Sequence, residues 1–146
     1  MLIQTIDEND AHEFCTRDEG HFFDRKAIGI KAAKLQKIAV AFANADGSEF
    51  VVGIADSKDE PDPAKRWAGQ AAQEDFNPHI QSLTEITPTL PVRYGFLACP
   101  TRPGLVLHVS VEKSGQVHST ADKSVYVRKG AQSLPLHSAE QITALV

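Results

Sequence analysis

Apolar residues recur at helical spacing in two segments of the chain. In residues 31–47 the apolar positions are three or four apart: Leu35, Ile38, Phe42 and Ala45. This spacing is typical of an amphipathic helix with one buried face, and the segment ends in a turn sequence where Gly47 can adopt a positive φ. The same spacing recurs between Phe76 and Ile86, before Pro88. We therefore expect a helix in each segment.

Strand-like patterns lie between and after these segments. Single strands are expected over residues 22–26, 49–56 and 124–130, and a hairpin of two strands is expected over residues 92–114. Short helices are predicted at the two ends, over residues 7–17 with Asp7 as N-cap and over residues 138–145. Helices thus alternate with strands before a run of strands. This order predicts a single α/β (α+β) domain over residues 1–146, with a mixed β-sheet flanked by helices.

Composition agrees with one globular domain and narrows its class. The chain has 146 residues, about one domain in length, and its net charge of −4 argues against a protein that coats nucleic acid by bulk electrostatics. A local basic patch remains compatible with that charge. The two cysteines fit neither a metal-ligand spacing nor a disulfide framework, so a cytoplasmic location is expected. No signal peptide is recognisable, and no run reaches the roughly 20 apolar residues of a membrane span.

Charged residues crowd the end of the first expected strand. Asp24 and Lys26 are two positions apart and therefore share a face of that strand, and Glu19 precedes Asp24 by five residues. Asp56 ends the next strand, which a crossover helix would place parallel to the first, with both carboxyl ends at one edge. Converging carboxylates that hold Mg²⁺ or Mn²⁺, with a nearby lysine, suit phosphodiester cleavage. An ordinary solvated strand end accounts for the same residues.

The helix over residues 31–47 carries its charges at the unexpected end. Between Lys26 and Asp46 the charged residues are all lysines in the first half of the helix: Lys31, Lys34 and Lys37. The helix dipole favours acidic residues there, so either the lysines form a solvated face or they contribute to an anion site. Further cations would extend such a site if the first and last strands are neighbours: Arg25, Lys26, Arg128 and Lys129.

Other sites of chemistry have little support in the sequence. The six histidines show no pair three or four residues apart, which disfavours zinc. The sequence has no serine in a nucleophile elbow and no phosphate-binding glycine motif of the P-loop kind, and no cofactor-binding residues are predicted.

Three segments in order resemble a known family. They read EGHFFDRK from Glu19, IAVAFANADGSEFVVGIAD from Ile38 and VYVRKGAQSLPL from Val125. Together they resemble the Schlafen-type AlbA-like domain, also called the divergent AAA-associated putative DNA-binding domain, over about residues 19–136. The chain differs in having Ser48 in place of the second glycine of the family's pair. It also has DRK where EFK is usual, so the second carboxylate is shorter by one methylene.

The resemblance implies nucleic-acid binding. In the nuclease members it implies a three-carboxylate, metal-dependent centre that cleaves tRNA or rRNA. Those acids correspond to Glu19, Asp24 and Asp56, with Mg²⁺ or Mn²⁺ as the cation, and Lys26 corresponds to the family lysine.

These observations favour a metal-dependent endonuclease that cleaves structured RNA. The alternatives are a non-catalytic DNA- or RNA-binding regulatory module of an ATPase or transcription regulator, and a dimerisation module. A single AlbA-like lobe leads us to expect a homodimer. The binding-module alternative includes the case in which this domain is the N-terminal part of a longer protein.

Overall fold

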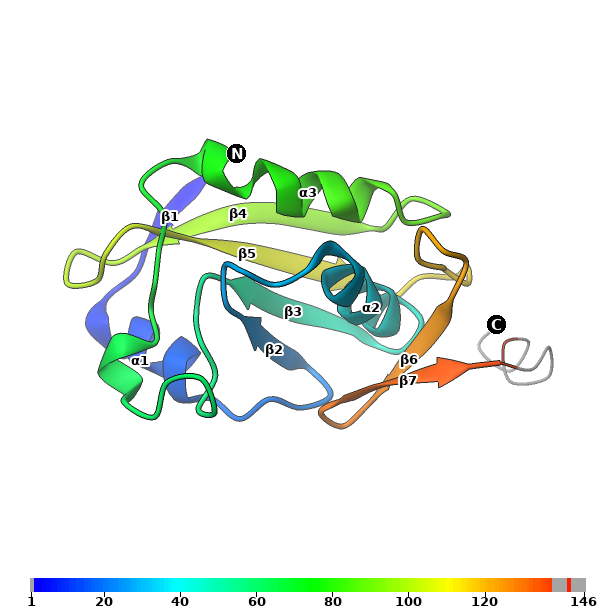
Figure 1. Cartoon of the computed structure of the whole chain (residues 1–146), viewed down its shortest axis with the longest axis horizontal. Helices are drawn as coiled ribbons and strands as arrows, with labels where there is room; N and C mark the ends of the chain where they lie inside the picture. Colours follow the sequence, from blue (N-terminus) through cyan, green and yellow to red (C-terminus); the bar gives the residue numbers. More distant parts are fainter. Residues whose placement is uncertain (1, 138–141, 143–146) are drawn as a thin grey trace.

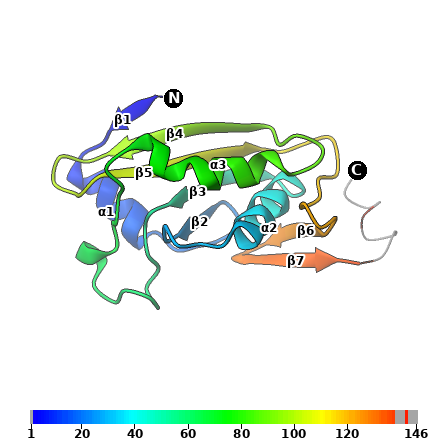
Figure 2. The same cartoon turned by 45° about the horizontal axis from the view of Figure 1, so that its top comes forward.

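A five-stranded mixed sheet forms the centre of the computed structural model, which describes residues 2–137 and residue 142. Figures 1 and 2 show helices packed on the sheet and a separate two-stranded hairpin at one end. The sheet has the strand order β1-β4-β5-β3-β2. Its strands are β1 (Ile3–Thr5), β2 (Phe23–Lys26), β3 (Gly47–Val52), β4 (Val92–Ala98) and β5 (Leu105–Glu112). The hairpin consists of β6 (Val125–Lys129) and β7 (Gln132–Leu136).

The connection from β2 through α2 (Ala32–Ala43) makes β2 and β3 parallel neighbours. Asp24 lies opposite Phe50, and Lys26 lies opposite Val52. The remaining contacts of the sheet are antiparallel between β3 and β5 and between β4 and β5, and parallel between β1 and β4. Because β2 is an edge strand, the acidic and basic residues at its end lie at the border of the sheet rather than in its middle.

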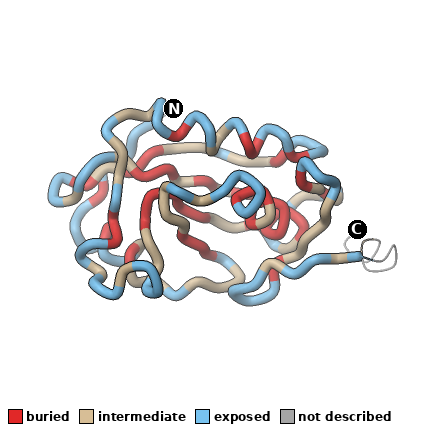
Figure 3. Tube along the Cα trace, in the orientation of Figure 1, coloured by how far each residue is buried: buried red, intermediate tan, exposed pale blue. Residues whose placement is uncertain are grey.

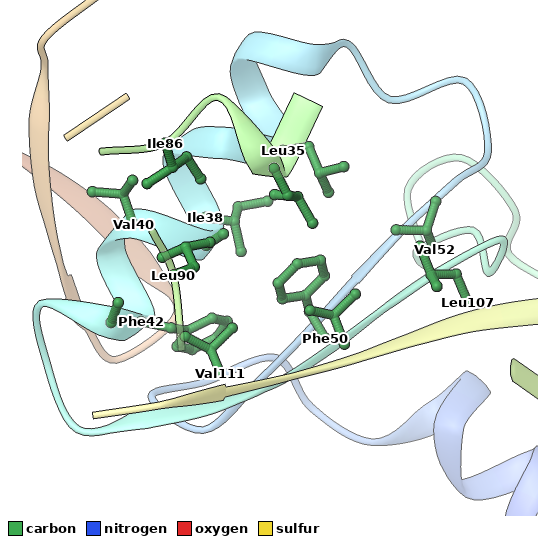
Figure 4. Close-up of a cluster of buried hydrophobic side chains, with 14 of the residues drawn as sticks. Leu35, Ile38, Val40, Phe42, Phe50, Val52, Ile86, Leu90, Leu107 and Val111 are labelled. Carbon is green, nitrogen blue, oxygen red and sulfur yellow. The ribbon is translucent and has the colours of Figure 1, made fainter. Parts of the chain in front are cut away.

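The larger hydrophobic core lies between one face of the sheet and the helices α2 and α3 (Asn77–Thr84). Figure 4 shows Leu35 and Phe42 of α2 facing Phe50 of β3. All three side chains are fully buried, as the helical spacing of α2 predicts. Gly47 begins β3 with φ +74°, and a Cβ there would lie 2.6 Å from the backbone nitrogen of Lys113. The predicted positive φ is therefore present, but at the start of β3, after α2 has ended at Ala43.

The opposite face of the sheet packs against α1 (Glu8–Thr16), whose N-cap Asp7 accepts a hydrogen bond from Asp10 N, as predicted. Residues alternate between the two faces along each strand. Phe23 and Arg25 of β2 therefore point toward α1, whereas Asp24 and Lys26 point toward α2. Figure 3 shows buried segments running along the strands and along α2.

The predicted α/β class, the two central helices and the hairpin of β4 and β5 are confirmed. Two strands were missed. Three-residue β1 is too short to show alternation, and β7 contains Pro135, which disfavours a strand except at an edge. The helix expected over 138–145 falls on residues outside the described ranges, residue 142 apart. In the described ranges, no helix has the length and apolar character needed to cross a membrane.

Candidate functional site

A pocket of about 210 Å³ lies between α2, the end of β2 and the hairpin. Ionisable side chains supply most of its functional groups: Glu19, Asp24, Lys26, Lys34, Lys37 and Arg128. Ile30 and Ile38 contribute apolar wall. Two carboxyls and four cations thus share one small pocket at the border of the sheet.

Asp24 is the buried centre of this group. Its carboxylate Oδ2 lies 2.9 Å from Arg128 Nη2, and its Oδ1 lies 3.3 Å from Lys26 Nζ. The Lys26 ammonium is at ion-pair distance but outside hydrogen-bonding geometry, so Oδ1 is a buried oxygen without a hydrogen bond in the described part of the chain. A buried acceptor in that state is unusual and marks a position suited to a further ligand.

The neighbouring carboxyl of Glu19 has a strongly perturbed acidity. Burial, followed by the adjacent Asp24 carboxyl, raises the pKa of Glu19 to about 7, although Lys26 and Arg25 oppose the shift. Two adjacent carboxyls of this kind repel each other when both are ionised. The pair therefore favours either a shared proton or a bound cation.

Arg128 determines where the Asp24 carboxylate points. Its guanidinium also donates to Gly20 O at 3.1 Å and to Ser133 Oγ at 3.1 Å, and it lies over the Phe42 ring. Arg128 Nη2 also donates to Phe23 O of β2 at 3.4 Å, so this one side chain links the edge strand to the hairpin. Its role is to hold Asp24.

The buried side chain of Asn44 fixes the position of β6 beside α2. Asn44 Nδ2 donates to His118 O and to Tyr126 O, each at 2.9 Å, and its Oδ1 accepts from His118 N at 2.8 Å. Since β6 pairs with β7 and belongs to no larger sheet, these bonds help to place Arg128 at the pocket. From the sequence alone, Asn44 is predicted only as part of the turn that ends the helix. The signal for its structural role is its position in the IAVAFANADG stretch that resembles the family.

The lysines of α2 differ in their positions. Lys34 is exposed and Lys37 is half-buried, and both line the pocket. Lys31, the N-cap residue, is exposed outside the pocket lining, as is Lys129 at the end of β6. A surface anion would therefore meet Lys34 and Lys37 at the pocket itself.

Two predicted nucleic-acid contacts require correction. Arg25 is 5% exposed, and its guanidinium donates to the carbonyls of Phe14 and Arg17 on the α1 side of the sheet. Arg128 is 2% exposed and paired with Asp24. Both arginines are structural because alternation and packing turn them away from solvent.

Asp56 lies apart from the pocket lining. The parallel pairing does bring the backbone after β3 to Lys26, whose carbonyl accepts from Gly53 N and Ile54 N. The Asp56 carboxylate then accepts from Lys58 N and Asp59 N, both at 2.9 Å, which stabilises its own turn. Among the described residues, no three His, Cys, Asp or Glu side chains form a group able to hold a metal ion. Ligation by all three acids stays a prediction.

Comparisons with known proteins agree with this architecture. The family described as Schlafen, AlbA_2 matches residues 19–137. The solved structures include the DIP2311 protein from Corynebacterium diphtheriae, with 19% identity and a TM-score of 0.54. The match covers 82% of this chain and 23% of that one, so it shows a shared fold within a longer protein. The curated proteins contain no match. Because the family match spans most of the sequence, including Glu19, Asp24 and Arg128, the chain belongs to the Schlafen, AlbA_2 family.

Proposed function

We propose that the domain binds nucleic acid at the pocket between α2 and the hairpin, and that it cleaves structured RNA with a divalent cation. The observation that carries the proposal is the juxtaposition of the Glu19 and Asp24 carboxyls with Lys26, Lys34 and Lys37 in one pocket. Membership in the family indicates a function related to nucleic acid. Cleavage is the finer step, and it rests on the carboxyl pair.

The donor set is compatible with Mg²⁺ or Mn²⁺. Both ions prefer carboxylate oxygens, and the buried Oδ1 of Asp24 lies beside the perturbed carboxyl of Glu19. Glu19 and Asp24 would hold the cation, which would polarise the phosphate and activate water. Asp56 can become a third ligand if its carboxylate leaves the turn at Lys58 and Asp59.

The basic residues of the pocket have different proposed roles: binding RNA, stabilising charge and positioning Asp24. Lys34 and Lys37 bind the sugar–phosphate backbone as point charges, which positions RNA without reading its sequence. Lys26, beside Asp24, stabilises the negative charge that develops on the phosphate. Arg128 is a positioning residue, because its guanidinium is held by Asp24, Gly20 O and Ser133 Oγ and its side chain is 2% exposed.

One observation favours the second candidate, a non-catalytic nucleic-acid-binding module. Asp24 already lies near two cations, Arg128 and Lys26, and a buried ion pair of this kind can serve structure alone. In that case the pocket would bind phosphate without hydrolysis.

The test is incubation of tRNA with Mn²⁺ or Mg²⁺, and separately with EDTA. We expect cleavage with the metal and none with EDTA. Glu19→Gln and Asp24→Asn, which keep side-chain shape, should abolish cleavage while RNA binding persists. Asp59→Asn is the matched control, since it removes an acid from the exposed turn outside the pocket.

Cleavage that survives in both pocket variants would refute the catalytic assignment. RNA binding by the wild-type protein without cleavage under any metal condition would instead establish the binding module. Asp56→Asn reports separately on the third acid, with loss of cleavage expected if it is a ligand.

A further inference from the structure

A second hollow, of about 270 Å³, lies beside the first turns of α2. Its walls come from α2, the end of α3, the loop before β6, and β6 itself. Ala32 and Ala33 are small and exposed, and half-buried Tyr126 is the aromatic residue of the lining. The hollow is therefore a cavity with one aromatic residue in its wall that the proposed phosphate chemistry does not use.

The hollow adjoins the phosphate pocket. Tyr126 and Arg128 are two positions apart on β6 and so project from the same face of that strand, one lining each cavity. Lys37 lines the phosphate pocket, and its Nζ lies 5.3 Å from the centre of the Tyr126 ring. A nucleotide whose phosphate contacts Lys37 therefore has Tyr126 within reach of its base.

The walls are held in place without a ligand. Gln36 is 4% exposed; its Nε2 donates to Ser82 O at 2.8 Å, and its Oε1 accepts from Ala121 N at 3.0 Å. This one side chain connects α2, α3 and the loop before β6. Asn44 in turn holds the backbone of Tyr126. The cavity is thus preformed, which lowers the entropic cost of binding.

The charges of the two cavities are opposite. The phosphate pocket contains four cations against two carboxyls, whereas the charged residues that line the second hollow are Glu85 and Asp122, both exposed carboxylates. Both acids repel a phosphate. Glu85 Oε2 already accepts from Gln36 Nε2, and Asp122 Oδ1 accepts from Thr120 Oγ1 and Ser124 N, so Glu85 Oε1 and Asp122 Oδ2 are the oxygens that can accept from an amino group of a base. Every base has a π-face that stacks on an aromatic ring. Adenine, cytosine and guanine carry an exocyclic amino group with two N–H donors, which can meet both carboxylates, whereas uracil has no such group and offers the single N3–H.

We infer that the hollow beside Tyr126 is a nucleobase subsite that prefers bases with an exocyclic amino group over uracil. The inference rests on the proposed nucleic-acid binding and is independent of cleavage. Preference for particular bases then comes from this hollow, whereas the lysines of α2 contact the sugar–phosphate backbone of any sequence.

The test compares three labelled single strands of equal length by fluorescence anisotropy: oligoadenylate, oligouridylate and an abasic ribose–phosphate strand. We expect the wild-type protein to bind oligoadenylate most tightly. Tyr126→Ala should weaken oligoadenylate binding about ten-fold and leave the abasic strand unchanged. Tyr126→Phe, which keeps the ring, is the matched control and should bind as the wild type does. The double variant Glu85→Gln, Asp122→Asn should narrow the difference between oligoadenylate and oligouridylate.

Equal affinity of the wild-type protein for all three strands would overturn the subsite, as would a Tyr126→Ala loss of the same size for the abasic strand. If none of the three binds, the proposed nucleic-acid binding fails and the inference fails with it. NMR provides a check that needs no variant. Adenosine 5′-monophosphate should shift the amides of Ala33 and Ala121 more than uridine 5′-monophosphate does, and equal or absent shifts would contradict the inference.

Discussion

Arg128 Nη2 lies 2.9 Å from Asp24 Oδ2, and only 2% and 3% of the two side chains are exposed. The pair joins the edge strand β2 to a hairpin that follows it by about 100 residues. Such a buried ion pair contributes little net stability compared with an apolar pair, but loss of one partner leaves an uncompensated charge. The carboxylate that the proposed chemistry uses therefore depends on the hairpin for its charge partner.

Arg128→Leu should lower the free energy of unfolding by about 3 kcal/mol, because buried Asp24 would keep only Lys26 as a neighbouring cation and Gly20 O would lose its donor. Urea unfolding measures this loss. The double variant Asp24→Asn, Arg128→Leu is the control and should recover part of the stability. If Arg128→Leu lost less than about 1 kcal/mol, the pair would contribute no more than a solvent-exposed ion pair does, which would contradict this prediction.

Stability should depend on pH through Glu19, whose pKa is raised from 4.5 to about 7 by burial and by Asp24. Below pH 4.5 the carboxyl is protonated in both the folded and the unfolded chain. Between pH 4.5 and 7 the unfolded chain loses this proton first, so the contribution of Glu19 to the free energy of unfolding falls as pH rises. Glu19→Gln should therefore stabilise the protein more at pH 8 than at pH 4, by about 1 kcal/mol after allowance for solvent screening. Urea unfolding at both pH values measures the difference, and an equal effect at the two would contradict the raised pKa.

Lys34 and Lys37 should control affinity for the nucleic-acid backbone. Replacing both by alanine should weaken binding about equally across sequences and reduce the slope of log K against log salt by up to about one unit per lysine. The free energy of unfolding should change little, because two small effects oppose each other. Removing the lysines relieves their unfavourable interaction with the dipole of α2, but it also removes the weak cation–π contact between Lys37 and Tyr126.

The matched control for the lysine pair is Lys58→Ala, Lys65→Ala, which removes the same charge from the polar loop after β3. A salt titration against one RNA and one DNA duplex measures both double variants. If the two variants behave alike, the lysines of α2 are an ordinary solvated face.

A homodimer with twofold symmetry should form, because one AlbA-like lobe would then meet a second to complete a groove. Multi-angle light scattering over a range of protein concentrations measures the mass. A monomer that still binds RNA at high concentration would argue against this arrangement.

Elements with strong periodicity can be predicted from local sequence patterns. Leu35, Ile38 and Phe42 predict α2 because their spacing matches one helix face, and Asp7 predicts a helix start because its side chain can bond a backbone nitrogen three residues on. Alternation also places Asp24 and Lys26 on one face of β2. The same rule would have placed Arg25 on the opposite face. These properties depend on residues close together in the chain.

Contacts between groups far apart in the chain depend on how the elements pack in three dimensions. Arg128 is a surface cation by composition, but it becomes the buried partner of Asp24 because Asn44 holds β6 against α2. Asp56 follows a parallel strand as expected, yet local hydrogen bonds turn its carboxylate to Lys58 and Asp59. Periodicity specifies the face on which a side chain lies, whereas its partner depends on how separate elements pack, and that packing has no local signature in the sequence.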